Sequence, residues 1–81
     1  MQLSIITPNK KEIFDVSWVE CNTATGSYVI QPGHAPMILA LSEKKPFIFA
    51  LKSGQEEAIM IEQGIAHITR ENVTLLISQK D

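Results

Sequence analysis

His34 is the residue of this chain whose surroundings most suggest chemistry, because it lies in the hexapeptide QPGHAP at residues 31–36. A histidine framed by prolines and a glycine could act as a general base, bind a metal ion or form part of a docking surface. A base would need a second polar group within hydrogen-bond reach of its ring, and the sequence offers no obvious candidate. The residues alone leave a rigid connector and a docking loop equally open, with catalysis well behind both.

Other side chains that could react or bind a metal ion are Cys21 and His67, the only thiol and the only other imidazole of the sequence. They share no tight spacing such as CxxC or HxxxH with each other or with His34, so we predict no metal site. Cys21 is expected to be a small buried hydrophobe, and His67, in the run IAHIT, is expected to face solvent or a rim. No nucleophile lies near a base and no Gly-rich phosphate loop precedes a helix, so we predict no catalytic residue and no cofactor.

The frame around His34 is stiff. Pro32 fixes its own φ, and the residue before it is pushed into an extended conformation that should end a strand. Gly33 permits a tight reversal, and Pro36 keeps Ala35 extended before the next apolar run. The histidine is therefore expected at a fixed place on the surface. A stiff loop loses less conformational entropy on docking than a flexible loop does.

The length and composition of the chain limit what it can be. With 81 residues, of which 44% are hydrophobic and 20% charged, it is expected to form one soluble domain with a small core. The net charge of −2, without a basic cluster larger than a lysine pair, argues against nucleic-acid binding. A single cysteine fits a reducing compartment. No signal peptide is visible, and the uncharged stretch 21–42 contains too many breakers to span a membrane as a helix.

Frequent turn signals separate short runs of Ile, Val, Phe and Leu along the whole sequence. Such spacing is typical of all-β folds, so we predict a small β-sandwich of about eight to ten short, mostly antiparallel strands. It would form one domain over residues 1–81. A first hairpin is expected from 47–52 and 56–61, with a turn at Gly54. A second is expected from 65–69 and 73–78, with Asn72 as its left-handed residue.

Alternating side chains favour strands over helices. Phe14, Val16 and Trp18 would share one face of a strand, and residues 73, 75 and 77 would share one face of another. Trp18 is expected in the core, with a part in an interface as the alternative. Runs that are apolar on both faces, such as residues 5–6, suggest a second covered surface besides the core. A helix is the alternative for 12–21 and for 37–45, where Pro36 could begin it. Strand is favoured for 12–21, and strand followed by loop for 37–45.

The run GSYVIQPGHAPMILAL at residues 26–41 resembles the signature of the epsilon subunit of F-type ATP synthases. In that family a glycine-led strand runs into PGHAP and then into a second apolar strand. The likeness covers the chain, because LSIITPNKKEIFDVSWVE resembles the family's first strands and IEQGIAHITRENVTLLIS resembles its last hairpin and terminal strand. PGHAP is the most specific of these matches.

The resemblance implies a non-catalytic subunit at the foot of the central stalk, which binds the gamma subunit and rests on the c ring. It would couple their rotation during proton- or sodium-driven ATP synthesis, peripheral to the membrane on the cytoplasmic face of the bacterial inner membrane or in the equivalent organelle compartment. The partner-binding residues that it implies are Ser27, Tyr28, Gln31, His34, Ala35, Pro36 and Met37. This hypothesis predicts a flat apolar patch with the histidine at its edge. The alternative, a free-standing β-sandwich that binds another protein or a small ligand, predicts a concave pocket.

The chain departs from the pattern of that family at several positions. Ser27 stands where an acidic residue is common near the c-ring contact, and Val29 replaces a glycine. Gln63 replaces the first of two glycines, so that only Gly64 carries over, and the loop at residues 42–46 replaces a Lys-Pro-Gly turn. Many members continue into a C-terminal helical hairpin that can inhibit ATP hydrolysis and in some cases binds ATP. That hairpin is expected to be absent from these 81 residues, and no ATP site is expected.

Overall fold

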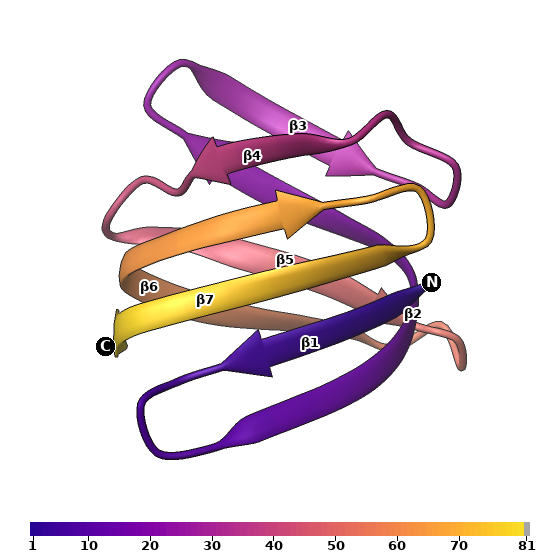
Figure 1. Cartoon of the computed structure of the whole chain (residues 1–81), viewed down its shortest axis with the longest axis horizontal. Helices are drawn as coiled ribbons and strands as arrows, with labels where there is room; N and C mark the ends of the chain where they lie inside the picture. Colours follow the sequence, from indigo (N-terminus) through magenta and orange to yellow (C-terminus); the bar gives the residue numbers. More distant parts are fainter. Residues whose placement is uncertain (81) are drawn as a thin grey trace.

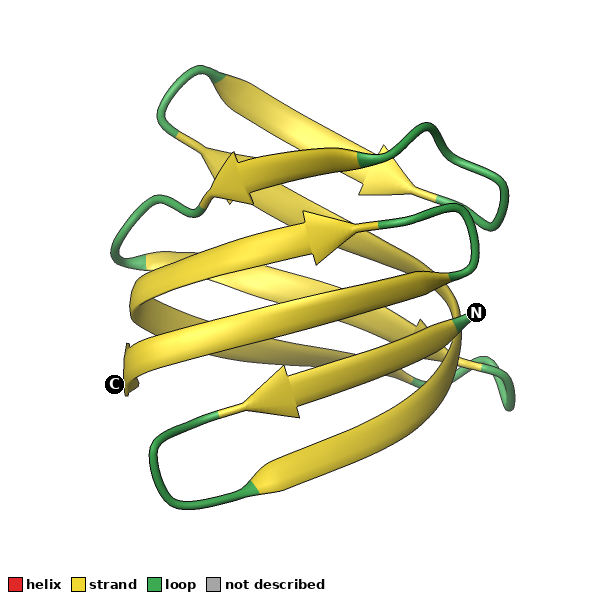
Figure 2. Cartoon of the chain, viewed as in Figure 1, coloured by secondary structure: helices red, strands yellow, loops and turns green. Residues whose placement is uncertain are grey.

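The computed structural model describes residues 1–80, which form strands joined by short turns (Figure 1, Figure 2). Within these residues there are seven strands and no helix. The strands are β1 (Gln2–Ile6), β2 (Lys11–Thr23), β3 (Gly26–Ile30), β4 (Met37–Ala40), β5 (Lys45–Leu51), β6 (Glu56–Ile68) and β7 (Asn72–Lys80). This part of the chain contains no helix that could cross a membrane.

The strands form two layers that share their longest members, β2 and β6, each of 13 residues. The front layer in Figure 1 contains β4, the second half of β6, β7 and β1. The layer behind it contains the first half of β6, β5, the second half of β2, and β3. β1 also pairs with the first half of β2, which joins the two layers along one side. Among the described pairings β1 and β7 run parallel and all others are antiparallel, so the predicted all-β, mostly antiparallel fold is confirmed.

The core lies between the layers and takes alternate residues from each strand. Val73, Leu75 and Ile77 are all buried, as their alternation predicts. Phe47 is the largest fully buried side chain, and its ring centroid lies 6.2 Å from that of Phe49. The other fully buried large side chains are Leu3, Ile30, Ile61, Ile68, Leu75, Val16, Val19, Val73 and Cys21. Because almost every strand contributes to this one cluster, the small domain depends on each of them.

The prediction of eight to ten strands is wrong, because the described residues form seven. Residues 56–61 and 65–69 were expected as separate strands, since Gln63-Gly64 between them is a turn signal. In the structure residues 56–68 form one strand, β6, whose register against β7 shifts at Ile61, Gln63 and Gly64. A bulge of this kind bends a strand without ending it.

The predicted core position of Trp18 is also wrong, because Trp18 is half-buried and Val19 takes the core position. The register between β2 and β5 shifts between Val16 and Trp18. This irregularity changes the inward-facing positions from even to odd residue numbers. The strand predicted for 12–21, and the strand followed by a loop predicted for 37–45, are confirmed.

Both predicted hairpins form, but only one of their turns has the predicted conformation. Gly54 has a φ of 97°, as expected. Asn72 is not left-handed, since the only non-glycine residue with positive φ among those described is Lys44. The side chain of Thr69 closes the second turn instead, because its Oγ1 accepts a hydrogen bond from the backbone N–H of Asn72 at 3.1 Å.

Gly54→Val is expected to lower the free energy of unfolding by about 1–3 kcal/mol, since valine rarely adopts the backbone conformation found here. The cost is one of backbone conformation, because a Cβ at Gly54 would meet nothing within 4 Å. Urea unfolding followed by circular dichroism measures it. The matched control is Ser53→Val in the same turn, which should stay within about 0.5 kcal/mol of the unchanged chain. Equal stability of the two variants would contradict the prediction.

Candidate functional site

The hexapeptide that contains His34 forms a tight turn between β3 and β4. The N–H of His34 donates to the carbonyl of Gln31 at 3.1 Å, with Pro32 and Gly33 at the central positions. Gly33 has a φ of 87°, which is the arrangement of a type II turn. The N–H of Gly33 also donates to the carbonyl of Arg70 at 2.7 Å, so the turn is tied to the connection between β6 and β7.

The ring of His34 is half-buried and bonds to the backbone beside it. Its Nδ1 lies 2.8 Å from the carbonyl oxygen of Ala35. A carbonyl oxygen only accepts, so Nδ1 carries the hydrogen and the neutral ring offers Nε2 as an acceptor. This hydrogen bond orients the ring, but within the described residues no side chain bonds to the ring to form a catalytic pair with it. The geometry therefore fits a docking contact better than general-base catalysis.

The structure brings most of the predicted partner-binding residues together around this turn. Gln31, Ala35 and Pro36 are exposed on it, and Met37 begins β4 half-buried. Because the turn is short and tied to the neighbouring connection, these side chains have a fixed arrangement relative to the histidine.

The remaining predicted residues, Ser27 and Tyr28, lie on β3 and are exposed. The Oγ of Ser27 donates to Oδ1 of Asn22 on β2. Ser27 follows the first residue of β3, whereas the turn follows its last residue. Ser27 is therefore at the opposite end of the strand from His34, and the predicted residues do not form one compact site.

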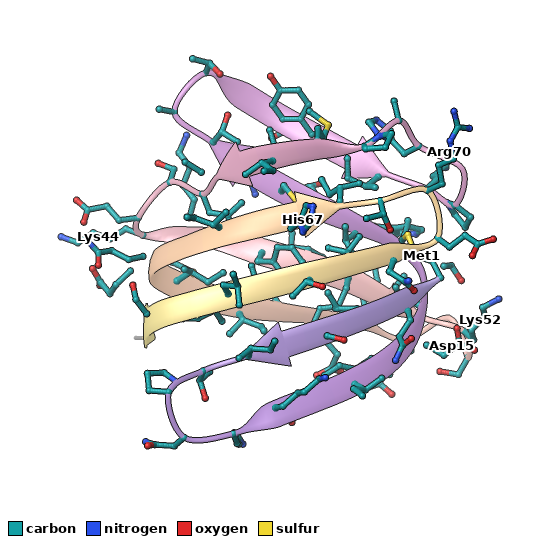
Figure 3. The ribbon with its side chains drawn as sticks, viewed as in Figure 1. Met1, Asp15, Lys44, Lys52, His67 and Arg70 are labelled. Atoms are coloured by element: carbon teal, nitrogen blue, oxygen red, sulfur yellow. The ribbon has the colours of Figure 1, made fainter. Side chains whose placement is uncertain are left out.

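A mostly apolar surface of the front layer faces solvent, and we call it the outer face. Strand register places two rows of side chains side by side on it. The first row is Ile6, Ala40, Ile65 and Leu76, and the second is Ser4, Ile38, His67 and Thr74. Ile38 is 69% exposed, Ile65 46% and Leu76 45%. His67 lies in the middle of this face (Figure 3), as an exposed residue, which confirms its predicted orientation.

Sequence reasoning did not single out Ile38, Ile65 and Leu76 as site residues. A signal for them exists, because Leu76 lies between the buried Leu75 and Ile77 and must point to the opposite side of β7. The sequence indicated a second covered surface from similar runs, but it did not identify which strands would form it.

Two hollows lie at opposite ends of the outer face. One has a volume of about 730 Å³ and is lined in part by Glu43 and Glu62. The other has a volume of about 430 Å³ and lies between Pro36 and the β6–β7 connection that contains Arg70. In Figure 3 Arg70 marks the end near the histidine turn, and Lys44, next to Glu43 in sequence, marks the other end. The turn thus lies at one end of the outer face, and the larger hollow overlaps its other end.

Cys21 is fully buried, as predicted, and its surroundings suppress its reactivity. Burial, and to a smaller extent the neighbouring Glu20 carboxylate, raises the pKa of the Cys21 thiol from 9.0 to about 12. The thiolate is the form that reacts and binds metals. The described residues contain no cluster of three or more His, Cys, Asp and Glu side chains that could hold a metal ion.

At pH 8 we expect Cys21 of the folded chain to react with a thiol reagent at least 100-fold more slowly than in urea. The raised pKa lowers the fraction of thiolate, and burial keeps the reagent away from the sulfur.

The raised pKa of Cys21 also makes the stability of the fold depend on pH. Above pH 9 the unfolded chain releases a proton that the folded chain keeps until about pH 12, so stability should fall in this window and not below it.

Urea unfolding of Cys21→Ala between pH 8 and pH 11 is the matched control, because it retains every other titrating group. The unchanged chain should lose at most about 1.4 kcal/mol per pH unit more than this variant does. Parallel pH dependence of the two chains would contradict the prediction.

Comparisons with known proteins agree with this arrangement of strands. Residues 1–79 match the family described as ATP synthase, Delta/Epsilon chain, beta-sandwich domain. The comparison with curated proteins finds no match. The family is a non-catalytic part of ATP synthase, which confirms the prediction of an accessory subunit rather than an enzyme.

Solved ATP synthase structures contain chains with the same fold. A chain in the cryo-EM structure of the Euglena gracilis mitochondrial ATP synthase, with OSCP, F1 and the c-ring, superposes with a TM-score of 0.84 at 17% identity. That match covers 98% of this chain and 51% of the Euglena chain. A chain of the Tetrahymena thermophila mitochondrial ATP synthase central stalk and c-ring gives 0.81 at 16% identity, with 98% and 63% covered.

The chain therefore spans about half to two thirds of the length of these structural relatives. At such low identities the superpositions show the fold, whereas the family match rests on the sequence itself. Because that match extends from residue 1 to residue 79, the chain belongs to the ATP synthase delta/epsilon family and corresponds to its beta-sandwich domain.

Proposed function

We propose that this chain is a rotor subunit of an F-type ATP synthase, which binds the gamma subunit, rests on the c ring and couples their rotation. Its work is mechanical, and it remains peripheral to the membrane on the cytoplasmic face of the bacterial inner membrane or in the equivalent organelle compartment. Family membership supports the kind of complex. The Euglena and Tetrahymena structures with the same fold both include a c-ring.

The outer face is the observation that carries this proposal. Apolar side chains as exposed as Ile38, at 69%, are unfavourable in water when they gather in one patch, and such patches mark interaction surfaces. The face contains no Asp, Glu, Lys or Arg among its eight residues. The lack of charge suits a broad apolar contact with another protein, because no ionised group would lose its water when the face is covered. We assign this face, with the His34 turn at its end, to the gamma subunit.

The exposed end of β3 is the proposed contact with the c ring. Ser27 and Tyr28 are exposed there and lie away from the His34 turn. Because Ser27 replaces the acidic residue common in this family, the contact would use hydrogen bonds rather than a carboxylate. The hydroxyl of Ser27 already bonds to Asn22, which would hold it in position.

A second candidate function is a free-standing β-sandwich that binds a small ligand or another protein, and the hollow beside Glu43 favours it. Its volume of about 730 Å³ falls within the range of small-molecule sites. The two functions are separated by mixing the purified chain with the cognate gamma subunit at micromolar concentration in size-exclusion chromatography. Co-elution supports the rotor subunit, and separate elution at that concentration overturns it.

His34→Ala is expected to leave the free energy of unfolding within about 0.5 kcal/mol of the unchanged chain and to weaken gamma binding by about tenfold. The reason is that the ring of His34 bonds to its own loop and fills no core position. Isothermal titration measures the binding and urea unfolding the stability. Gln55→Ala, in an exposed turn away from the outer face, serves as the control. Loss of folding in His34→Ala would show that His34 is structural and not a contact residue.

A further inference from the structure

The hollow beside Glu43 is continuous with the outer face. Three of its lining residues, Ile6, Ile65 and Leu76, form most of one row of that face. Anything that covers the outer face from the gamma side would therefore also pass over the hollow. With a volume of about 730 Å³, the hollow is large enough to hold a large side chain and not only a water molecule.

The backbone explains why this end of the sheet is hollow. β6 bulges between Ile61 and Gly64, and Gly64 contributes no side chain to the surface. A Cβ at Gly64 would lie 3.1 Å from Cγ2 of Ile61 and 3.3 Å from the carbonyl oxygen of Leu76, so the site is closely packed from below. The packing of Ile61 and Leu76 therefore leaves no room for a side chain at position 64.

The floor of the hollow is apolar, whereas its rim carries negative charge. The buried Ile77 and the half-buried Leu41 form the floor, whereas the charged residues that line the hollow within the described part of the chain are the exposed Glu43 and the half-buried Glu62. The loop that contains Glu43 is held on both sides by backbone hydrogen bonds, from Leu41 N–H to the Gly64 carbonyl and from Lys44 N–H to the Ile61 carbonyl, both of 3.0 Å. The exposed carboxylate of Glu43 is therefore kept close to an apolar cavity.

We propose that this hollow is the anchor site of the outer face, which takes a large apolar side chain of the gamma subunit with a lysine or arginine beside it. The apolar side chain would fill the floor, and the basic group would meet the carboxylate of Glu43. Binding energy at protein interfaces concentrates on a few side chains that fill pockets, and opposite charges at the rim speed association and fix register. This inference rests on the proposed function, and it names the chemistry that the gamma subunit must present.

Blocking the hollow tests the apolar part of the proposal. Ser78 lines the hollow and is exposed, with its Oγ donating to Oε1 of Gln63 at 3.2 Å. Ser78→Trp should place an indole ring over the floor and weaken gamma binding at least tenfold in isothermal titration. Ser17→Trp, an exposed serine on β2, is the matched control and should change binding less than twofold. Gln63→Trp is a second blocking variant, in case circular dichroism shows that Ser78→Trp does not fold.

Reversing the rim charge tests the electrostatic part. Glu43→Lys should weaken gamma binding at least tenfold at 50 mM salt and lose much of that effect at 500 mM. Glu56→Lys makes the same change in net charge at the start of β6 and should bind like the unchanged chain.

The outcomes separate the two proposals. If the unchanged chain binds gamma and the blocking and rim variants bind equally well, the anchor site is wrong and the rotor function stands. If the unchanged chain does not bind gamma at all, the rotor function falls and the anchor site with it. A cross-link from a benzophenone amino acid at position 78 to an apolar gamma residue next to a lysine or arginine would support the anchor. A cross-link to an acidic segment would overturn it.

Discussion

Ile38→Asp is expected to abolish measurable binding of the gamma subunit at micromolar concentration while the chain stays folded. Ile38 is the most exposed of the large apolar side chains in the described structure, at 69%, and it lies on β4 at one end of its row, beside His67. A carboxylate there would be buried against an apolar partner without a cation on the outer face to pair with it. Such a change at an interface costs about 3 kcal/mol or more, which is about 100-fold in Kd.

Met60→Asp provides the matched control for this experiment. Met60 is also an exposed apolar residue, at 42%, but it pairs with Pro46 of β5 and so lies in the layer behind the outer face. It should bind gamma as the unchanged chain does, and both variants should unfold in urea at similar concentrations. Equal loss of binding in both would indicate that negative charge, rather than position, weakens the complex. Unchanged binding of Ile38→Asp would remove the outer face from the gamma contact.

Local constraints explain why the His34 turn could be predicted from the sequence. Pro32 and Gly33 restrict the backbone by themselves, and the structure needs only the hydrogen bond from His34 to Gln31 to complete the type II turn. The buried face of β7 was predictable for a similar reason, since positions 73, 75 and 77 are all apolar, whereas of positions 74, 76 and 78 only Leu76 is. Asn72 shows the limit, because the side chain of Thr69 decided that turn and sequence statistics pointed to the asparagine.

The parts that could not be predicted depend on partner strands rather than on local sequence. The register shift between Val16 and Trp18 exists only relative to β5, and it decides which of Trp18 and Val19 is buried. Likewise, the sequence predicts a turn at Gly64. In the structure Gly64 lies at the bulge of β6, where Ile61 and Leu76 leave no room for a side chain. When a strand is apolar on both faces, its sequence does not tell whether a second layer of the same domain or another protein covers the second face.

The same strands consequently supply residues to both the core and the outer face, and the two sets of residues have different roles. In β7 Val73, Leu75 and Ile77 belong to the core, whereas Thr74 and Leu76 belong to the surface that we assign to gamma. A substitution at Leu76 should therefore affect binding, and one at Leu75 should affect folding. The two effects can be measured separately, because the two side chains point to opposite sides of one strand.

Phe47→Ala is expected to have the largest effect on folding, lowering the free energy of unfolding by about 3–5 kcal/mol. Phe47 is the largest fully buried side chain, and its ring lies at the end of an aromatic series in which Phe49 contacts both Phe47 and Phe14. A domain of this size has a total stability of about 4–12 kcal/mol, so the variant would lose a large fraction of it. Urea unfolding followed by tryptophan fluorescence gives the value, and Phe47→Leu provides a milder variant if the alanine variant is unfolded.

Ile13→Ala is the control for this prediction, because Ile13 is 55% exposed on β2 and should cost less than about 1 kcal/mol. A cost of Phe47→Ala below 1 kcal/mol would mean that the core around β5 is not packed as described. The binding experiment adds a second criterion. Gamma binds only the folded chain, so excess gamma should raise the urea midpoint of Phe47→Ala, as mass action requires, and should leave that of Ile38→Asp unchanged. The opposite result would mean that the side chains assigned to the core and to the outer face have been exchanged.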